Sequence, residues 1–204
     1  MARWLCVLTC ALATGCVSEP TIDPVVDIEA HKLVVLPFSE PHLARYESRR
    51  GNTLAKMVAD WIAEKRRADE DDAIDVVRFD ELVHALRDVD PRDLEPLEVA
   101  RRTGADYALV GEITRYETRR RGDVGVIRGR AEVRLDVLDV AAGPDRPIFS
   151  TRIAVQYPPD DYTMAGVMPL TEGDEKAIET GLMLRLTERI GELFTYHTVR
   201  WHRR

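Results

Sequence analysis

Two stretches in the second half of the chain alternate between apolar or β-branched side chains and more polar ones, and this alternation constrains the fold more than any other feature. It runs through residues 131–137 and again through 149–157. A period of two places alternate side chains on opposite faces of a strand, so each stretch predicts a strand with one buried and one solvent-exposed face. Residues 107–118 begin apolar and become polar, and a Gly-Pro-Asp turn lies at 143–145. Three such strands joined by turns predict an antiparallel meander.

The remaining patterns predict an α/β fold with a single mixed sheet. Residues 32–38 (KLVVLPF) form a continuous apolar run, which predicts a strand buried on both faces at the centre of the sheet. Apolar residues within 54–62 recur with the spacing of one helical face. Further helices are predicted after an N-cap at Asp80, before Gly104, and from about residue 171 onward. These helices are expected to pack on the sheet around one core.

The first fifteen residues have the layout of an export signal. Arg3 precedes an apolar stretch from Trp4 to Ala13, and small residues follow it. A helix of fifteen residues spans about 22 Å, which is too short for a hydrocarbon core of about 30 Å. Residues 1–15 therefore predict a removable signal peptide and not a membrane span.

The signal ends in a sequence, LATGC, that resembles the lipobox of bacterial lipoproteins. The resemblance implies cleavage before Cys16 and attachment of diacylglycerol to its side chain, and the acyl chains of such lipoproteins suffice for stable anchoring. An ordinary secretory signal with a chance cysteine and an uncleaved anchor are the alternatives. Val17 and Ser18 follow the cysteine where an inner-membrane retention signal often has Asp, which favours the outer membrane and a protein that faces the periplasm.

The mature chain is expected to have three parts. Residues 16–31 lack periodic patterning and predict a tether that extends at most about 50 Å. Residues 32–196 form the α/β domain, and residues 197–204 form a basic tail. Trp201 and its neighbouring arginines could touch a membrane interface, or the tail could be a frayed end. The two other cysteines leave with the signal, so we expect no disulfide, no thiolate nucleophile and no cysteine-ligated metal.

No constellation of catalytic residues stands out. The serines lie outside any G-x-S-x-G sequence, and the histidines lack the spacing of a zinc site. We therefore expect no enzymatic activity, no metal and no cofactor. The formal net charge of -7 at pH 7 also disfavours binding to nucleic acid.

An arginine-rich segment stands out against this acidic background. The expected hairpin between the first two strands of the meander carries Arg115, Arg119, Arg120, Arg121, Arg128 and Arg130. Brought together, these side chains would create a local positive field that could bind an acidic protein, phospholipid headgroups or anionic wall polymers. The alternative is that they pair with carboxylates on the same strands, as surface charges often do. We treat these arginines as the candidate binding residues.

Several segments resemble one group of envelope lipoproteins. This group contains the curli secretion protein CsgG, the penicillin-binding-protein activator LpoB and the amino-terminal domain of TolB. The segments of this chain that are similar to it are KLVVLPF, LAKMVADWI, ARRTGADYALVGEITRYE and VRLDVLDVAAG. The similarity spans residues 32–194. It implies the α/β domain of that group, with helices packed on one sheet.

The same resemblance implies a function. It points to a non-enzymatic, lipid-anchored envelope protein that binds another envelope component, as an adaptor or activator of wall or outer-membrane assembly. Its partners would be the membrane, reached through acyl chains on Cys16, and an envelope protein. Two alternatives stay open: a subunit of a CsgG-like oligomeric secretion channel, in which copies of the chain assemble, and a hydrolase of wall or lipid substrates.

Overall fold

A five-stranded mixed sheet forms the centre of the protein. The computed structural model describes residues 21–28, 30–43, 45–66, 74–90, 95–119, 128–143, 146–159 and 175–198. The strand order is β3-β2-β4-β5-β6, with β2 (Lys32–Val35), β3 (Asp75–Val76), β4 (Tyr107–Glu117), β5 (Gly129–Asp139) and β6 (Phe149–Tyr157). β2 pairs in parallel with β3 and β4, whereas β4, β5 and β6 pair antiparallel. The predicted single mixed sheet with a three-strand antiparallel meander is confirmed.

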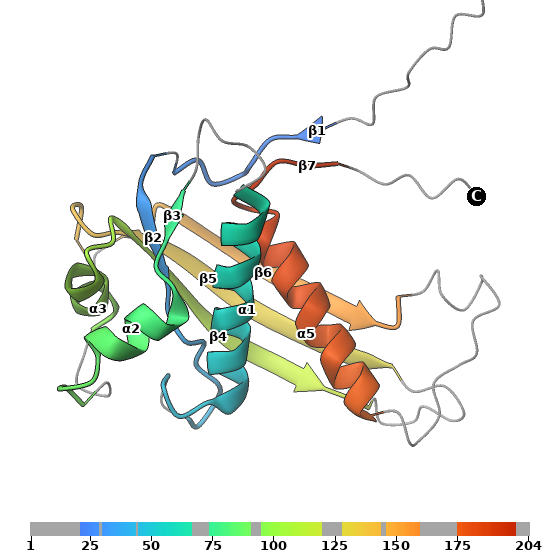
Figure 1. The fold of residues 1–204 in the computed structure, drawn as a ribbon. Coiled ribbons are helices and arrows are strands. Elements are labelled where there is room, and N and C mark those ends of the chain that lie inside the picture. Colours follow the sequence, from blue (N-terminus) through green and yellow to red (C-terminus); the bar gives the residue numbers. More distant parts are fainter. Residues whose placement is uncertain are drawn as a thin grey trace, which may run out of the picture.

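Helices cover the two faces of this sheet unequally. α1 (Arg49–Arg66) and α5 (Glu175–Gly191) lie side by side on one face, and the main core fills the space between them and the strands (Figure 1). The short helices α2 (Phe79–Ala85) and α3 (Pro96–Thr103) cover the other face near β2 and the start of β4. A second, smaller apolar cluster lies there, around Val34, Leu36 and Ala108. No described helix covers that face over most of β5 and β6.

Two details of the fold differ from the sequence-based expectations. β2 is buried on both faces as predicted, but β4 takes the central place, because it pairs with β2 on one side and with β5 on the other. α2 begins at Phe79 and follows Arg78, so the predicted cap at Asp80 is wrong. The Asp80 carboxylate lies in the first turn, where the helix dipole favours a negative charge, and pairs with Arg78 at 3.1 Å. α3 ends as predicted at Gly104, which has a φ of 67°.

Residues 21–28 belong to the folded part, although they fall within the expected tether over residues 16–31. β1 (Thr21–Ile22) pairs antiparallel with β7 (His197–Thr198), so the first two residues of the expected tail are also part of the fold. Val26 and Ile28 are 4% and 1% exposed and belong to the main core. Burial of such side chains is worth about 1.5–3 kcal/mol each, which offsets part of the cost of ordering this segment. Only four residues therefore separate Cys16 from β1.

The two ends of α5 mark opposite ends of the domain. Near its beginning, Gly129 at the start of β5 lies against the side chains of Ile178 and Leu182. Beyond its end, the carbonyl of Leu193 accepts a 2.9 Å hydrogen bond from the amide of Val26, and β7 follows. α5 has 17 residues, which corresponds to about 25 Å of helix. The base of the β4–β5 hairpin and the β1–β7 ribbon are thus separated by the length of this helix (Figure 1).

Among the helices that the structure describes, none combines the length and the apolar character needed to cross a membrane.

Candidate functional site

The uncovered face of β5 and β6 carries alternating charges. Ala131, Val133, Leu135 and Val137 on β5 point to the helix layer and are fully buried. The intervening positions, which lie on the opposite face with Arg152 of β6, are Arg130, Glu132, Arg134 and Asp136. This is the solvent-exposed strand face that the period of two predicts.

The six candidate arginines are not all on this face. Arg115 and Arg130 lie on it, opposite Glu132 and Glu117 respectively. Arg119 follows the end of β4 and Arg128 precedes β5, so both belong to the end of the hairpin. Arg120 and Arg121 lie outside the described residues, as does Cys16. Their binding and lipidation roles stay predictions.

Ion pairs neutralise much of the positive charge along the strands. A side-chain nitrogen of Arg115 lies 2.9 Å from a carboxylate oxygen of Glu117, and one of Arg134 lies 3.2 Å from Glu112. The hydrogen bond and charge of Glu117 raise the pKa of the Arg115 guanidinium above its ordinary value. The strand part of the hairpin therefore presents a mixed pattern of both signs and not a uniformly positive surface. Arg115 and Arg134 therefore pair with carboxylates on the strands, which is the alternative to a binding role.

A β-bulge sets which side chains of β4 reach this face. The register shifts between Ile113 and Arg115, so Thr114 is the extra residue, and its hydroxyl donates a 3.2 Å hydrogen bond to the carbonyl of Glu132. If Thr114 occupied a regular strand position, strict alternation would turn Arg115 toward the helix layer and Tyr116 toward solvent. The bulge places Arg115 on the charged face and Tyr116 against α1 and α5.

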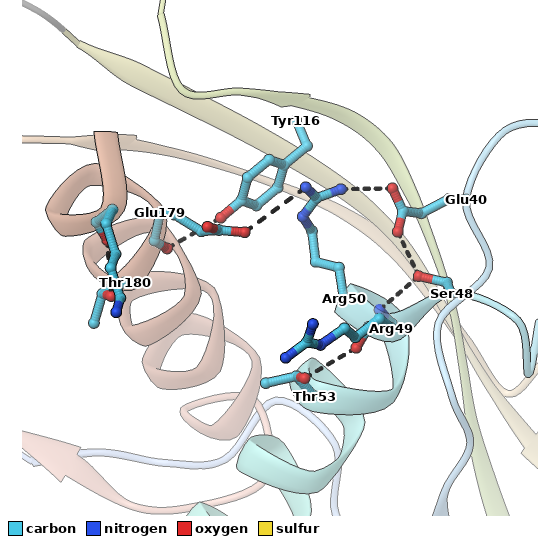
Figure 2. A network of polar contacts seen from close by, with 10 residues as sticks. Glu40, Ser48, Arg49, Arg50, Thr53, Tyr116, Glu179 and Thr180 are labelled. Carbon is cyan, nitrogen blue, oxygen red and sulfur yellow. Dashed lines mark hydrogen bonds and ion pairs between the residues drawn. The ribbon is translucent and has the colours of Figure 1, made fainter. Parts of the chain in front are cut away.

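A polar cluster on the helix side holds the base of the hairpin (Figure 2). The guanidinium of Arg50 lies between two carboxylates, 2.7 Å from Glu40 and 3.8 Å from Glu179, and its central carbon is 4.0 Å from the centre of the Tyr116 ring. The Tyr116 hydroxyl donates a 3.0 Å hydrogen bond to the carbonyl of Glu179. Burial, followed by the charge of Glu179, raises the pKa of Tyr116 to about 12. The phenol therefore keeps its proton, and with it the hydrogen bond, to higher pH than an ordinary tyrosine does.

Sequence reasoning missed this cluster, although one local signal for it exists. Ser48 precedes α1 and its hydroxyl accepts a 2.7 Å hydrogen bond from the amide of Gly51, which is the arrangement of an N-cap. The same hydroxyl donates to the Glu40 carboxylate. The cap thereby connects the start of α1 to Glu40 and Arg50. These groups bind one another, so the cluster acts as a structural link between loop, helices and sheet.

An open groove runs between α5 and the edge strand β6. It has a volume of about 710 Å³ and is lined by Tyr157 of β6 and by Lys176, Thr180, Leu184 and Arg185 of α5 among others. Gly181 also lines the groove, and a Cβ there would lie 2.4 Å from a ring atom of Tyr157. The described residues contain no group of three or more His, Cys, Asp or Glu side chains placed to hold a metal ion.

Comparisons with known proteins find solved structures that have TM-scores below 0.5 and little sequence identity to this chain. The chain matches no family model and no curated protein by sequence. PelC of Paraburkholderia phytofirmans, solved as a dodecamer, is similar with a TM-score of 0.45 and 14% identity over 87% of this chain and 99% of that one. The lipoprotein GNA1162 of Neisseria meningitidis is similar with a TM-score of 0.45 and 12% identity over 78% of this chain and 99% of that one. The carboxy-terminal domain of LpoB of Salmonella enterica has a TM-score of 0.37 and 19% identity, over 62% of this chain and 83% of that one.

Proposed function

We propose that the chain is a lipid-anchored protein of the bacterial envelope whose α/β domain binds another envelope protein and catalyses no reaction. The anchor is the acylated side chain of Cys16, which holds the domain at the outer membrane on its periplasmic side. The layout of residues 1–15 and the sequence LATGC support this anchor.

The observation that carries the proposal is that the anchored entry to the domain and the arginine-bearing hairpin lie at opposite ends of α5. The chain enters the domain at β1, five residues after Cys16, next to the end of α5. The arginine-bearing hairpin is fixed at the beginning of α5 through Tyr116 and Gly129. An anchor at one end thus leaves the hairpin about 25 Å away along the helix, where a partner in the periplasm can reach it.

The charge pattern favours a protein as the partner. A uniformly anionic polymer would gain from a purely positive surface, whereas the strands alternate arginines with carboxylates such as Glu112 and Glu117. Complementary patterns of both signs orient two proteins and exclude wrong partners. Arginine is also enriched at protein interfaces. We therefore assign the hairpin end and the charged face of β5 and β6 to the partner.

Photo-crosslinking in living cells tests this assignment. A photoreactive amino acid replaces Arg130 or Arg152 in the full-length chain, and a matched control replaces Val83 of α2, which is 56% exposed. We expect crosslinks to one envelope protein from the charged face and none to it from Val83. Crosslinks only between copies of the chain would overturn the adaptor in favour of the channel subunit. Absence of any crosslink from the charged face would remove the assigned binding surface.

The anchor has its own test. Mass spectrometry of the mature protein from a bacterial membrane is expected to show an amino-terminal peptide that begins with an acylated Cys16. A Cys16→Ser chain is the control and is expected to lack the acyl mass. A mature protein that begins at Met1, or one with an unmodified thiol, would contradict the lipoprotein assignment.

A further inference from the structure

Apolar side chains are exposed at the end of the domain where the chain enters and leaves. Ile22, Val25 and Tyr196 are 41%, 60% and 47% exposed. Such side chains are common singly on protein surfaces, but a group of them marks a contact surface. We call this group the β1–β7 end.

Backbone pairing brings these residues together although they come from opposite ends of the sequence. Ile22 is the register partner of His197, the residue that follows Tyr196. Val25 precedes Val26, whose amide donates to the carbonyl of Leu193. Figure 1 shows β1 and β7 side by side, beyond the carboxy-terminal ends of α1 and α5. The backbones of the three residues therefore lie in one small region.

The chain on either side of this region connects it to a membrane. Four residues separate Cys16 from β1, so the chain from Cys16 to Thr21 spans at most about 18 Å even when fully extended. After β7 the sequence continues with Arg200, Trp201, Arg203 and Arg204, residue types that favour the headgroup region of a bilayer. An acylated Cys16 would thus hold the β1–β7 end close to the lipid surface and raise its effective concentration there.

We propose that the β1–β7 end docks directly on the lipid surface that carries the anchor, with Ile22, Val25 and Tyr196 in contact with the membrane interface. This inference rests on the proposed acylation of Cys16. Tyrosine suits an interface because its ring is apolar and its hydroxyl is polar. Asp23 and Asp27 are exposed in the same segment, and the cost of burying their charges keeps the domain at headgroup depth.

Docking gives the domain a fixed orientation. A domain on a free tether would rotate, and its arginine-bearing hairpin would face the membrane part of the time. Contact through the β1–β7 end instead directs α5 away from the bilayer. The hairpin end then lies on the far side of the domain, in the space where the proposed partner is found.

Site-specific fluorescence on lipid vesicles tests the docking. The acylated mature chain has no other cysteine, so a cysteine introduced at one position takes an environment-sensitive dye at that position alone. The test positions are Ile22→Cys, Val25→Cys and Tyr196→Cys. The controls, Val83→Cys and Leu184→Cys, are 56% and 55% exposed and lie on α2 and α5. The labelled proteins are reconstituted in vesicles of phosphatidylethanolamine and phosphatidylglycerol, with and without brominated lipid as quencher.

The outcomes separate docking from anchoring. We expect all five proteins to float with the vesicles, and only the dyes at positions 22, 25 and 196 to shift to shorter wavelength and lose intensity with brominated lipid. Flotation with the same dye response at all five positions would overturn docking and leave the anchor intact. Failure to float would overturn both the anchor and the docking that rests on it.

Discussion

The guanidinium of Arg50 lies over the ring of Tyr116, with its central carbon 4.0 Å from the ring centre. Arg50 is in the first turn of α1 and Tyr116 is near the end of β4, so the contact joins the helix layer to the base of the hairpin. Glu40 and Glu179 complete the arrangement from the loop before α1 and from α5 (Figure 2). Four separate segments are thereby held together where the arginine-bearing hairpin leaves the sheet.

Replacement of Tyr116 by phenylalanine tests this link. The Tyr116→Phe variant leaves the Glu179 carbonyl without the 3.0 Å hydrogen bond, and we expect a loss of about 0.5–1.5 kcal/mol in the free energy of unfolding. Urea denaturation of the domain at neutral pH measures it. Tyr107→Phe is the control, because no hydrogen bond of its hydroxyl is found within the described residues, and it is expected to cost less. Equal effects of the two changes would show that the hydroxyl of Tyr116 contributes nothing specific.

The pKa of Tyr116 predicts how this difference depends on pH. A tyrosine in the unfolded chain ionises near pH 10, whereas in the folded protein the pKa of Tyr116 is raised to about 12. Above pH 10 the unfolded state loses this proton and the folded state keeps it, so folding becomes less favourable as pH rises. The stability advantage of the parent over Tyr116→Phe is full below pH 10 and should shrink between pH 10 and 12. A difference that stays constant across this range would contradict the raised pKa.

The segment before Lys32 offers a paired test of burial. Ile28 is 1% exposed and Val25 is 60% exposed, although they are close in sequence. We expect Ile28→Ala to lower the free energy of unfolding by about 2–5 kcal/mol. Val25→Ala should change it by less than about 0.5 kcal/mol in the absence of membrane. If residues 16–31 were a free tether, both variants would be as stable as the parent.

Gly111 of β4 is expected to tolerate no side chain. A Cβ at this position would lie 2.2 Å from ring atoms of Phe38, which is fully buried. Gly111→Ala should therefore cost about 1–3 kcal/mol through overpacking. The matched control is the same change in a Phe38→Leu background, where the smaller side chain leaves room and the added cost of Gly111→Ala should fall. The same cost in both backgrounds would mean that the contact with Phe38 is not the reason for glycine here.

The sequence predicts the elements whose patterns are local. Alternation through residues 131–137 is enough to assign β5 and its buried face, because residues two positions apart in a strand lie on the same face. Gly104 likewise ends α3 for a local reason, because it adopts a φ of 67°. The sheet and its meander were therefore predictable.

Features that depend on contacts between distant residues were not predictable in the same way. The bulge at Thr114 depends on how β4 pairs with β5, and nothing in the sequence of β4 alone marks an extra residue. Val26 is buried because it meets Leu193 from the other end of the chain. Arg50 and Glu179 are likewise far apart in sequence, so the cluster they form with Tyr116 becomes visible only in three dimensions.

Arginines on the two sides of the sheet should respond differently to substitution. The Arg115–Glu117 pair is exposed, with side chains 43% and 40% accessible, and such pairs contribute at most about 1 kcal/mol. Arg50 is more buried and pairs with Glu40, whose side chain is only 16% accessible. Loss of the Arg50 guanidinium therefore leaves the Glu40 carboxylate without its ion-pair partner and with little solvent to replace it. We expect Arg115→Gln to leave the unfolding midpoint nearly unchanged and Arg50→Gln to cost about 1.5–3 kcal/mol, measured by urea denaturation. A large loss of stability in Arg115→Gln would show that this arginine stabilises the hairpin. A small loss would mean that the variant is folded, so that a loss of partner binding can be measured with it directly.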